Sequence, residues 1–131
     1  GSIKKEGFRL EGVGLHILME FYDCSPTVLD DDKLLEELMI EAAEKASATI
    51  IKSVFHKFSP QGVTGVVVVA ESHLAIHTWP EKQYAAVDFF TCNDKMDHEK
   101  AQLHLKNGLL SSREVIKLVA RGTEISEDIK K

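Results

Sequence analysis

A short segment of the chain carries several side chains that could act as nucleophile, acid or base. Residues 66 to 81 read VVVVAESHLAIHTWPE, so an apolar run is followed by Ser72, His73 and His77. Hydroxyl and thiol groups can attack a carbonyl, and imidazole moves protons near neutral pH. Two further side chains of this kind lie on or beside adjacent predicted strands, Thr64 and Cys92. The spacing is consistent with an active site and does not by itself name the reaction.

Two common classes of site fit these residues poorly. A Ser-His-Asp hydrolase would place its serine in a G-x-S-x-G turn between a strand and a helix, and Ser72 has neither feature. A zinc site is also disfavoured, because Cys92 stands alone and the chain has no C-x-x-C or H-E-x-x-H spacing. His73 taken singly is interpreted as a hydrogen-bonded core or surface residue.

Alternation and turn residues predict the elements that must position these side chains. Strands are expected at 15–22, 48–57, 63–70, 73–79, 84–91 and 114–120, and DCSPT at 23–27 is expected to be a loop. Helices are expected from a cap at Asp30, Asp31 or Asp32 to near Ser47, and at 97–110. This order predicts an α+β two-layer sandwich, with a mainly antiparallel sheet and helices on one face. A partner protomer is expected to cover the other face.

The strand at 73–79 raises a geometric problem for chemistry at Ser72. Side chains alternate along a strand, so His73, His77 and Trp79 point one way while Leu74 points the other. Five residues separate Ser72 from His77, about 16 Å of extended strand, and the two face opposite sides. Either the chain bends sharply or His77 acts on Ser72 from a second copy.

Composition predicts a single domain over residues 1–131 that acts on a small molecule. The chain is 44% hydrophobic, enough for one core, and its net charge of −5 argues against nucleic acid. The longest apolar run, Val63 to Ala70, is interrupted by Gly65 and is too short to cross a membrane. No signal peptide is recognised, so a cytoplasmic location is expected, with Cys24 and Cys92 as reduced thiols.

Three segments in the same order resemble the small prokaryotic S-adenosylmethionine decarboxylases, which are pyruvoyl enzymes of spermidine synthesis. The segments are FHKFSPQGVTGVVVVAESH at 55–73, ESHLAIHTWPE at 71–81 and YAAVDFFTC at 84–92, within a similarity that spans roughly 13–122. The resemblance implies a proenzyme that cuts itself between Glu71 and Ser72. It would leave a β chain of residues 1–71 and an α chain of residues 72–131 that begins with a pyruvoyl group.

The resemblance also assigns roles in the reaction. Ser72 would attack the Glu71 carbonyl, Thr64 would assist the oxyanion, and His77 would remove the proton from the α-carbon of residue 72. In turnover Cys92 matches the proposed proton donor. The cofactor would be the pyruvoyl group alone, with neither a metal ion nor pyridoxal phosphate. Small members of the family build composite sites at a two-fold interface, so a homodimer is expected, with Thr64 and His77 acting in trans.

The substrate residues follow from the same resemblance. Phe58 matches the aromatic that stacks on adenine, Glu81 matches the carboxylate that binds the ribose hydroxyls, and Leu74 and Trp79 are expected to be pocket walls. The chain departs from the family pattern at Lys82, Gln83 and Asn93, where Gln83 replaces a glycine beside the ribose ligand. Two alternatives therefore remain: a homologue that decarboxylates ornithine or arginine, and an unprocessed subunit without activity.

Overall fold

The chain folds as a six-stranded sheet backed by helices. A computed structural model describes residues 13–92 and 95–122. The elements in chain order are β1 (Gly14–Tyr22), α1 (Pro26–Leu29), α2 (Asp32–Lys45), β2 (Ile50–Lys57), β3 (Val63–Val69), β4 (Ser72–Trp79), the 3-10 helix η2 (Pro80–Lys82), β5 (Tyr84–Thr91), α3 (His98–Leu109) and β6 (Arg113–Arg121).

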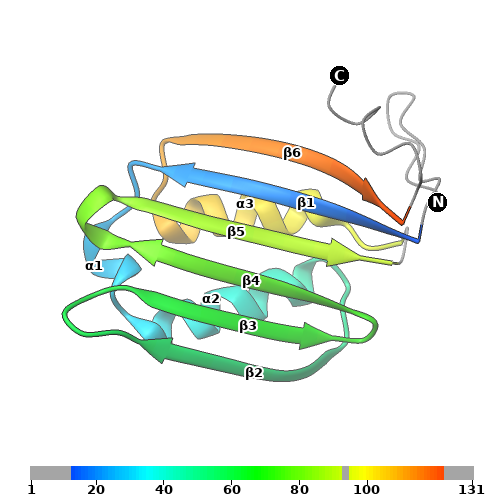
Figure 1. Cartoon of the computed structure of the whole chain (residues 1–131), viewed down its shortest axis with the longest axis horizontal. Helices are drawn as coiled ribbons and strands as arrows, with labels where there is room; N and C mark the ends of the chain where they lie inside the picture. The colour runs from blue at the N-terminus through cyan, green and yellow to red at the C-terminus, as the bar shows by residue number, and fades with distance from the viewer. Residues whose placement is uncertain (1–12, 93–94, 123–131) are drawn as a thin grey trace.

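The sheet has the strand order β2-β3-β4-β5-β1-β6, and each neighbouring pair is antiparallel. Helices α2 and α3 lie side by side behind it, and no described element covers its front (Figure 1). The predicted α+β two-layer architecture is confirmed. We call the side that packs against α2 and α3 the covered face, and the other side the open face.

Both long helices begin and pack as the sequence predicts. The side chain of Asp31 caps α2 by accepting a hydrogen bond from the amide of Leu34 at 3.0 Å, and Asp97 caps α3 through the amide of Lys100 at 3.2 Å. The buried side of α2 consists of residues at helical spacing: Leu35, Leu38, Met39, Ala42 and Ala43. The amphipathic pattern thus turns the apolar side of the helix towards the sheet.

The short helix α1 was not predicted, because the segment around Pro26 was expected to be a loop. The Ser25 hydroxyl accepts a hydrogen bond from the amide of Val28 at 3.2 Å, and Pro26 occupies the first helical position. One turn is too short to show helical periodicity. The burial of Leu29 fixes this turn against the core.

The covered face of the sheet supplies the core. Burial alternates residue by residue along β1 and β5, so that side chains such as Ile17 and Phe89 are inaccessible to solvent while their neighbours are half-buried. Leu74 and Ile76 of β4 follow the same rule and are 0% exposed. The predicted facing of β4 is therefore confirmed. The expectation that Leu74 is a pocket wall is wrong, because its side chain is enclosed in the core.

Candidate functional site

Ser72 and Cys92 lie together at one end of the sheet. Ser72 is the first residue of β4, half-buried, and is paired with Val69 across the turn of Ala70 and Glu71. Cys92 directly follows β5 and is exposed. The Ser72 hydroxyl accepts a hydrogen bond from the backbone amide of Cys92 at 3.4 Å. The residue expected to be processed and the expected proton donor are thus neighbours within one chain.

Thr64 and His77 form a second pair, on the open face. They are direct partners across β3 and β4, and the Thr64 hydroxyl lies 3.1 Å from Nδ1 of His77. His77 is exposed and Thr64 is half-buried. This hydrogen bond orients the imidazole, as a base that must meet a specific proton requires.

The two pairs do not meet within one chain. Strand β4 runs without interruption from Ser72 to Trp79, and its register with β3 and β5 shows no bulge. Ser72 pairs with the buried Val69, on the side of the covered face, whereas His77 lies on the open face. The sharp bend that the sequence left as one alternative is therefore absent. About 16 Å of strand separates the two residues.

Three of the four residues expected to bind substrate lie at the end of the sheet opposite to Ser72. Phe58 follows β2 and is exposed, with its ring 4.6 Å from that of His56. Trp79 ends β4, is 38% exposed and stacks on Tyr84 at 5.3 Å between ring centroids. Glu81 lies on η2 and is also exposed. The first two present aromatic faces to solvent, and Glu81 presents a free carboxylate.

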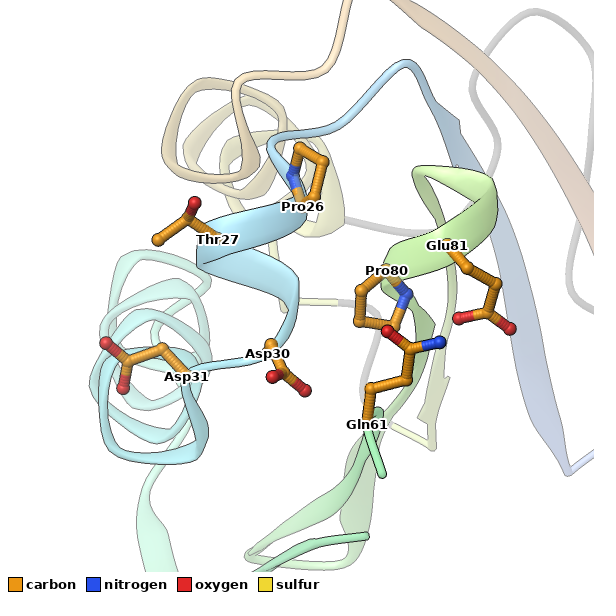
Figure 2. Close-up of a pocket in the computed structure, with 7 residues that line it drawn as sticks. All are labelled: Pro26, Thr27, Asp30, Asp31, Gln61, Pro80 and Glu81. Carbon is orange, nitrogen blue, oxygen red and sulfur yellow. The ribbon is translucent and has the colours of Figure 1, made fainter. Parts of the chain in front are cut away.

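Glu81 lines an open pocket of about 590 Å³. Figure 2 shows Glu81 and Gln61 on one side of this pocket and residues of the α1 region on the other. The complete lining is Pro26, Thr27, Asp30, Asp31, Gln61, Pro80 and Glu81. Phe58, Leu74 and Trp79 are not part of it. The single chain therefore brings only one of the four expected substrate residues into this pocket.

Asp30 holds the turn that carries Phe58 and Gln61. One carboxylate oxygen accepts a hydrogen bond from the Gly62 amide at 2.8 Å, and the other lies 3.1 Å from Nζ of Lys57. The amide and then the ammonium group keep the pKa of Asp30 below its usual value. The sequence indicated only a possible helix cap at this position. The partner is 32 residues away, so no local pattern could reveal the contact.

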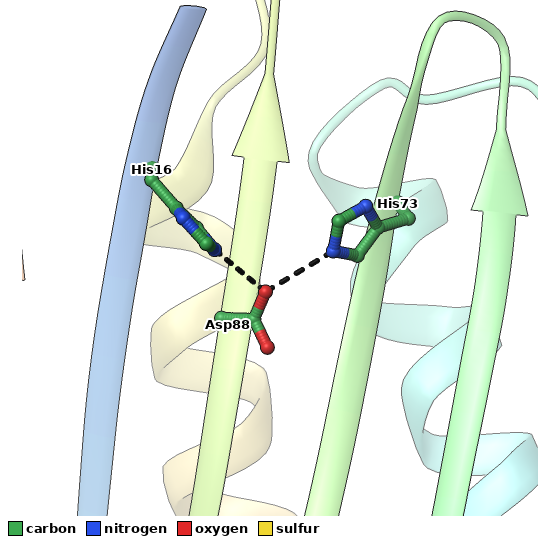
Figure 3. Close-up of side chains that lie close together, drawn as sticks. All are labelled: His16, His73 and Asp88. Atoms are coloured by element: carbon green, nitrogen blue, oxygen red, sulfur yellow. Dashed lines mark hydrogen bonds and ion pairs between the residues drawn. The ribbon is translucent and has the colours of Figure 1, made fainter. Parts of the chain in front are cut away.

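A polar cluster on the open face was not predicted as a unit. Oδ2 of Asp88 lies 2.7 Å from Nε2 of His16 and 3.1 Å from Nε2 of His73, and Figure 3 shows both rings pointing at this oxygen from either side. The three residues come from β1, β4 and β5, which are adjacent only in the folded sheet. The interpretation of His73 as a hydrogen-bonded residue is confirmed.

Hydrogen bonding around this cluster disfavours a metal ion. The group of His16, His73 and Asp88 is compact enough to surround a cation. Nη1 of Arg121, however, lies 3.0 Å from Nδ1 of His16. Arginine only donates hydrogen bonds, so Nδ1 must accept, and the proton of a neutral His16 sits on Nε2, facing Asp88. A protonated nitrogen has no lone pair for a metal, and the cluster therefore acts as a hydrogen-bonded network.

Comparison with known proteins decides the family. The family model described as S-adenosylmethionine decarboxylase matches residues 15–122. An S-adenosylmethionine decarboxylase proenzyme from Pseudomonas paraeruginosa is 54% identical over 110 residues, which are 84% of this chain and 69% of that protein. The chain belongs to the S-adenosylmethionine decarboxylase family. A proenzyme of the same name from Thermotoga petrophila is 51% identical over 104 residues, 79% of this chain and 80% of that protein.

Solved structures of S-adenosylmethionine decarboxylases share the fold. The adenosylmethionine decarboxylase from Aquifex aeolicus superposes with a TM-score of 0.78 at 36% identity, over 86% of this chain and 92% of that chain. The Trypanosoma brucei AdoMetDC-delta26 monomer gives a TM-score of 0.61 at 14% identity over 79% of this chain and 45% of that one, which shows the fold alone.

The family confirms several predictions from the sequence. The activity is that of a decarboxylase, a carbon–carbon lyase that acts on S-adenosylmethionine through a pyruvoyl group in polyamine synthesis. The ornithine or arginine alternative is not favoured. Both cysteines are free thiols, as predicted. None of the helices in the described part of the chain has the length and apolar character needed to span a bilayer.

Gln83, the main departure from the decarboxylase pattern, does not enter the pocket. Its backbone is left-handed, with φ of 52°, a conformation that suits the family's glycine. Its side-chain amide donates to the carbonyl of Cys24 at 3.1 Å, so the added side chain is directed to the segment before α1. The concern that Gln83 crowds the ribose ligand is therefore not supported. Asn93, another departure from the family pattern, lies outside the described residues.

Proposed function

We propose that this chain is the precursor of a self-processing S-adenosylmethionine decarboxylase whose complete sites form between two copies. Cleavage between Glu71 and Ser72 produces a β chain of residues 1–71 and an α chain of residues 72–131. The observation that carries the proposal is the arrangement of two separate pairs, Ser72 with Cys92 and Thr64 with His77. Each pair is already assembled within one chain. The first pair holds the serine to be processed, and the second pair holds the base that this processing needs.

Processing begins at the turn before β4. The Ser72 oxygen attacks the Glu71 carbonyl carbon, the bond from that carbon to the Ser72 nitrogen breaks, and the hydroxyl proton ends on the freed amine. The Thr64 hydroxyl from the second copy stabilises the oxyanion formed on the way. The amide becomes an ester with no change in composition.

Elimination then separates the two chains. His77 of the second copy removes the proton from the α-carbon of residue 72, and the bond between its β-carbon and the ester oxygen breaks. Glu71 leaves with a free carboxylate, and residue 72 becomes a dehydroalanine. One water adds as ammonia departs, and this leaves the ketone of the pyruvoyl group. The hydrogen bond between Thr64 and Nδ1 of His77 holds the imidazole in place for this step.

The remaining residues bind substrate and move a proton. When present, the pyruvoyl ketone acts as the electron sink for the bond to the substrate carboxylate. Cys92, beside residue 72, donates the proton that replaces carbon dioxide. Phe58 stacks on the adenine, Trp79 forms a wall and Glu81 accepts hydrogen bonds from the ribose hydroxyls. Leu74 contributes to the core that holds β4 in place and makes no contact with substrate through its side chain.

The open face supports a homodimer. It carries accessible apolar side chains on four strands, with Val54 62% exposed, Val115 43%, and Val68 and Trp79 each 38%. A second copy placed there would bury these groups. It would also supply a His77 to the Ser72 end of the sheet, which His77 of the same chain does not reach because β4 is straight. Two-fold symmetry would make two equivalent sites from one kind of contact.

Mass spectrometry of the purified protein tests the cleavage. We expect two fragments in place of the 14.6 kDa chain, the heavier ending at Glu71 and the other beginning with a blocked residue 72. Ser72→Ala must stay intact. His77→Ala is expected to stop at the ester, which hydroxylamine cleaves. An intact wild-type chain after long incubation would overturn the proposal.

Mixed dimers test the composite site. Ser72→Ala and His77→Ala chains, co-expressed with different tags, are expected to recover cleavage, because one site in each mixed dimer regains both groups. Each variant expressed alone serves as the control. Absence of cleavage in a mixed dimer verified by double-tag purification would place both groups in the same protomer.

A further inference from the structure

Glu71, which supplies the carbonyl to be cut, has a left-handed backbone. Its φ is +66°, and it is the second residue of the two-residue connection between β3 and β4. Turns with a positive φ at this position normally use glycine or asparagine, because a β-carbon there approaches the following carbonyl oxygen. A glutamate at this position therefore strains the peptide on the N-terminal side of Ser72.

The surrounding strands impose this conformation. Val69 pairs with Ser72 on the inner side of the turn, and the Ala70 amide donates to the carbonyl of Thr49 at 2.9 Å on the outer side. The Glu71 side chain is exposed, so the backbone and not side-chain packing sets the conformation. Strain of this kind persists where neighbouring structure determines it, and it is concentrated at functional sites.

Other residues with positive φ lie in different settings. Apart from glycine, they are Asp23, Ser47, Gln83 and Leu110. Asp23 directly follows β1, Gln83 directly follows η2, Leu110 directly follows α3, and Ser47 follows the C-cap residue of α2. Such positions commonly end an element with a left-handed residue. Among the described residues with positive φ, Glu71 is the one whose carbonyl lies in the bond assigned to cleavage.

We propose that the left-handed conformation of Glu71 accelerates self-cleavage, because strain in the intact turn is released when the peptide bond to the Ser72 nitrogen breaks. The inference rests on the proposed processing. In the precursor, the peptide bond ties Glu71 to a nitrogen held in the sheet. Once its carbon is transferred to the Ser72 oxygen, that tie is gone and φ of Glu71 relaxes to negative values. The precursor is thereby raised in free energy relative to the ester, and Glu71 acts as a positioning residue.

Two matched pairs of variants separate the backbone effect from the carboxylate. Asparagine and glycine tolerate the left-handed region, whereas glutamine and alanine do not, and all four lack the charge. We expect Glu71→Asn to cleave about five- to thirtyfold more slowly than Glu71→Gln, which is the factor that corresponds to the usual cost of a left-handed residue. Glu71→Gly is expected to be slower than Glu71→Ala by a similar factor. The readout is the rate of fragment appearance by mass spectrometry after refolding.

The stability of the uncleaved precursor towards urea provides a second readout. A purely structural role of Glu71 would not make the slower-cleaving variant the more stable one. In a Ser72→Ala background, which cannot cleave, Glu71→Asn is expected to unfold at higher urea than Glu71→Gln. Slower cleavage together with a more stable precursor supports the inference. Equal cleavage rates within both pairs, or slower cleavage together with a less stable precursor, would overturn it. A wild-type chain that never cleaves contradicts the proposed function, whereas a cleaving wild type with equal variants contradicts this inference alone.

Discussion

The covered and open faces of the sheet differ in chemistry although the same six strands supply both. On the covered face, Ile17, Leu74 and Phe89 are inaccessible to solvent and lie in one apolar cluster. The residue before each of these, on the open face, is polar. These residues are His16, His73 and Asp88, and they are joined by hydrogen bonds. Alternation allows each strand to contribute to stability and to chemistry at once.

The comparison also explains why the expected catalytic residues divide into two pairs. His77 and Thr64 point to the open face, which no described element covers, while Ser72 sits at a strand end on the opposite side. Because β4 is straight, the side chains of Ser72 and His77 in one chain cannot meet. The fold therefore keeps the two pairs apart within one chain, which is why the proposed function places the complete site between two copies.

Two adjacent phenylalanines offer the sharpest test of the difference between the faces. Phe89→Ala removes a fully buried ring and is expected to lower the free energy of unfolding by about 3–5 kcal/mol. Phe90→Ala removes a half-buried ring that contacts His16 and His73, and about 1–2 kcal/mol is expected. Urea titration of both in the Ser72→Ala background, at low protein concentration, measures the pair. Equal losses would show that the open face is as well packed as the core.

The polar network is expected to contribute less than the core. Asp88→Asn keeps the shape of the side chain but removes the charge to which two histidines donate hydrogen bonds. We expect it to lower the free energy of unfolding by about 1 kcal/mol. Lys117→Gln, an exposed charge removal on β6, is the control and should stay within about 0.5 kcal/mol. The same urea titrations apply. A loss for Asp88→Asn no larger than that of the control would mean that the network does not stabilise the chain.

The two thiols should differ in reactivity with no effect on the fold. Burial raises the pKa of Cys24 to about 11, so at pH 8 only about one thousandth of it is thiolate, while Cys92 is exposed. We expect iodoacetamide to label Cys92 in the native Ser72→Ala protein and to reach Cys24 only in urea. Native labelling of Cys24 at a similar rate would contradict its burial.

The same pKa has a consequence for stability at alkaline pH. Because the folded chain keeps the Cys24 thiol neutral above its ordinary pKa of 9.0, the stability due to this group is complete below pH 9. It falls as the pH rises towards 11, since only the unfolded chain ionises there. In the Ser72→Ala background, the difference in unfolding free energy between the chain with Cys24 and its Cys24→Ala variant should shrink over this range. A constant difference would indicate an unshifted thiol.

Local patterns in the sequence were sufficient to predict most of the elements and the facing of side chains along β4. Apolar residues at helical spacing and a run of aspartates predicted α2, and alternation in LHILMEFY and YAAVDFFT predicted β1 and β5. The placement of Ser72 and His77 on opposite sides of β4 also followed from alternation alone. These features depend on residues within a few positions of each other, and hydrophobic periodicity records such relations directly.

Contacts between distant residues required the tertiary structure. Asp30 with Gly62, and His16 with Asp88 and His73, are joined only because strands and helices far apart in sequence become neighbours, and polar residues of these types have no periodic signature. The direction of the Gln83 side chain and the enclosure of Leu74, which was expected to be a pocket wall, also depend on what packs against each residue. The sequence by itself determined the six strands, the two long helices and their order. Only the folded sheet decided which side chains touch, because side-chain contact depends on three-dimensional packing that local spacing does not encode.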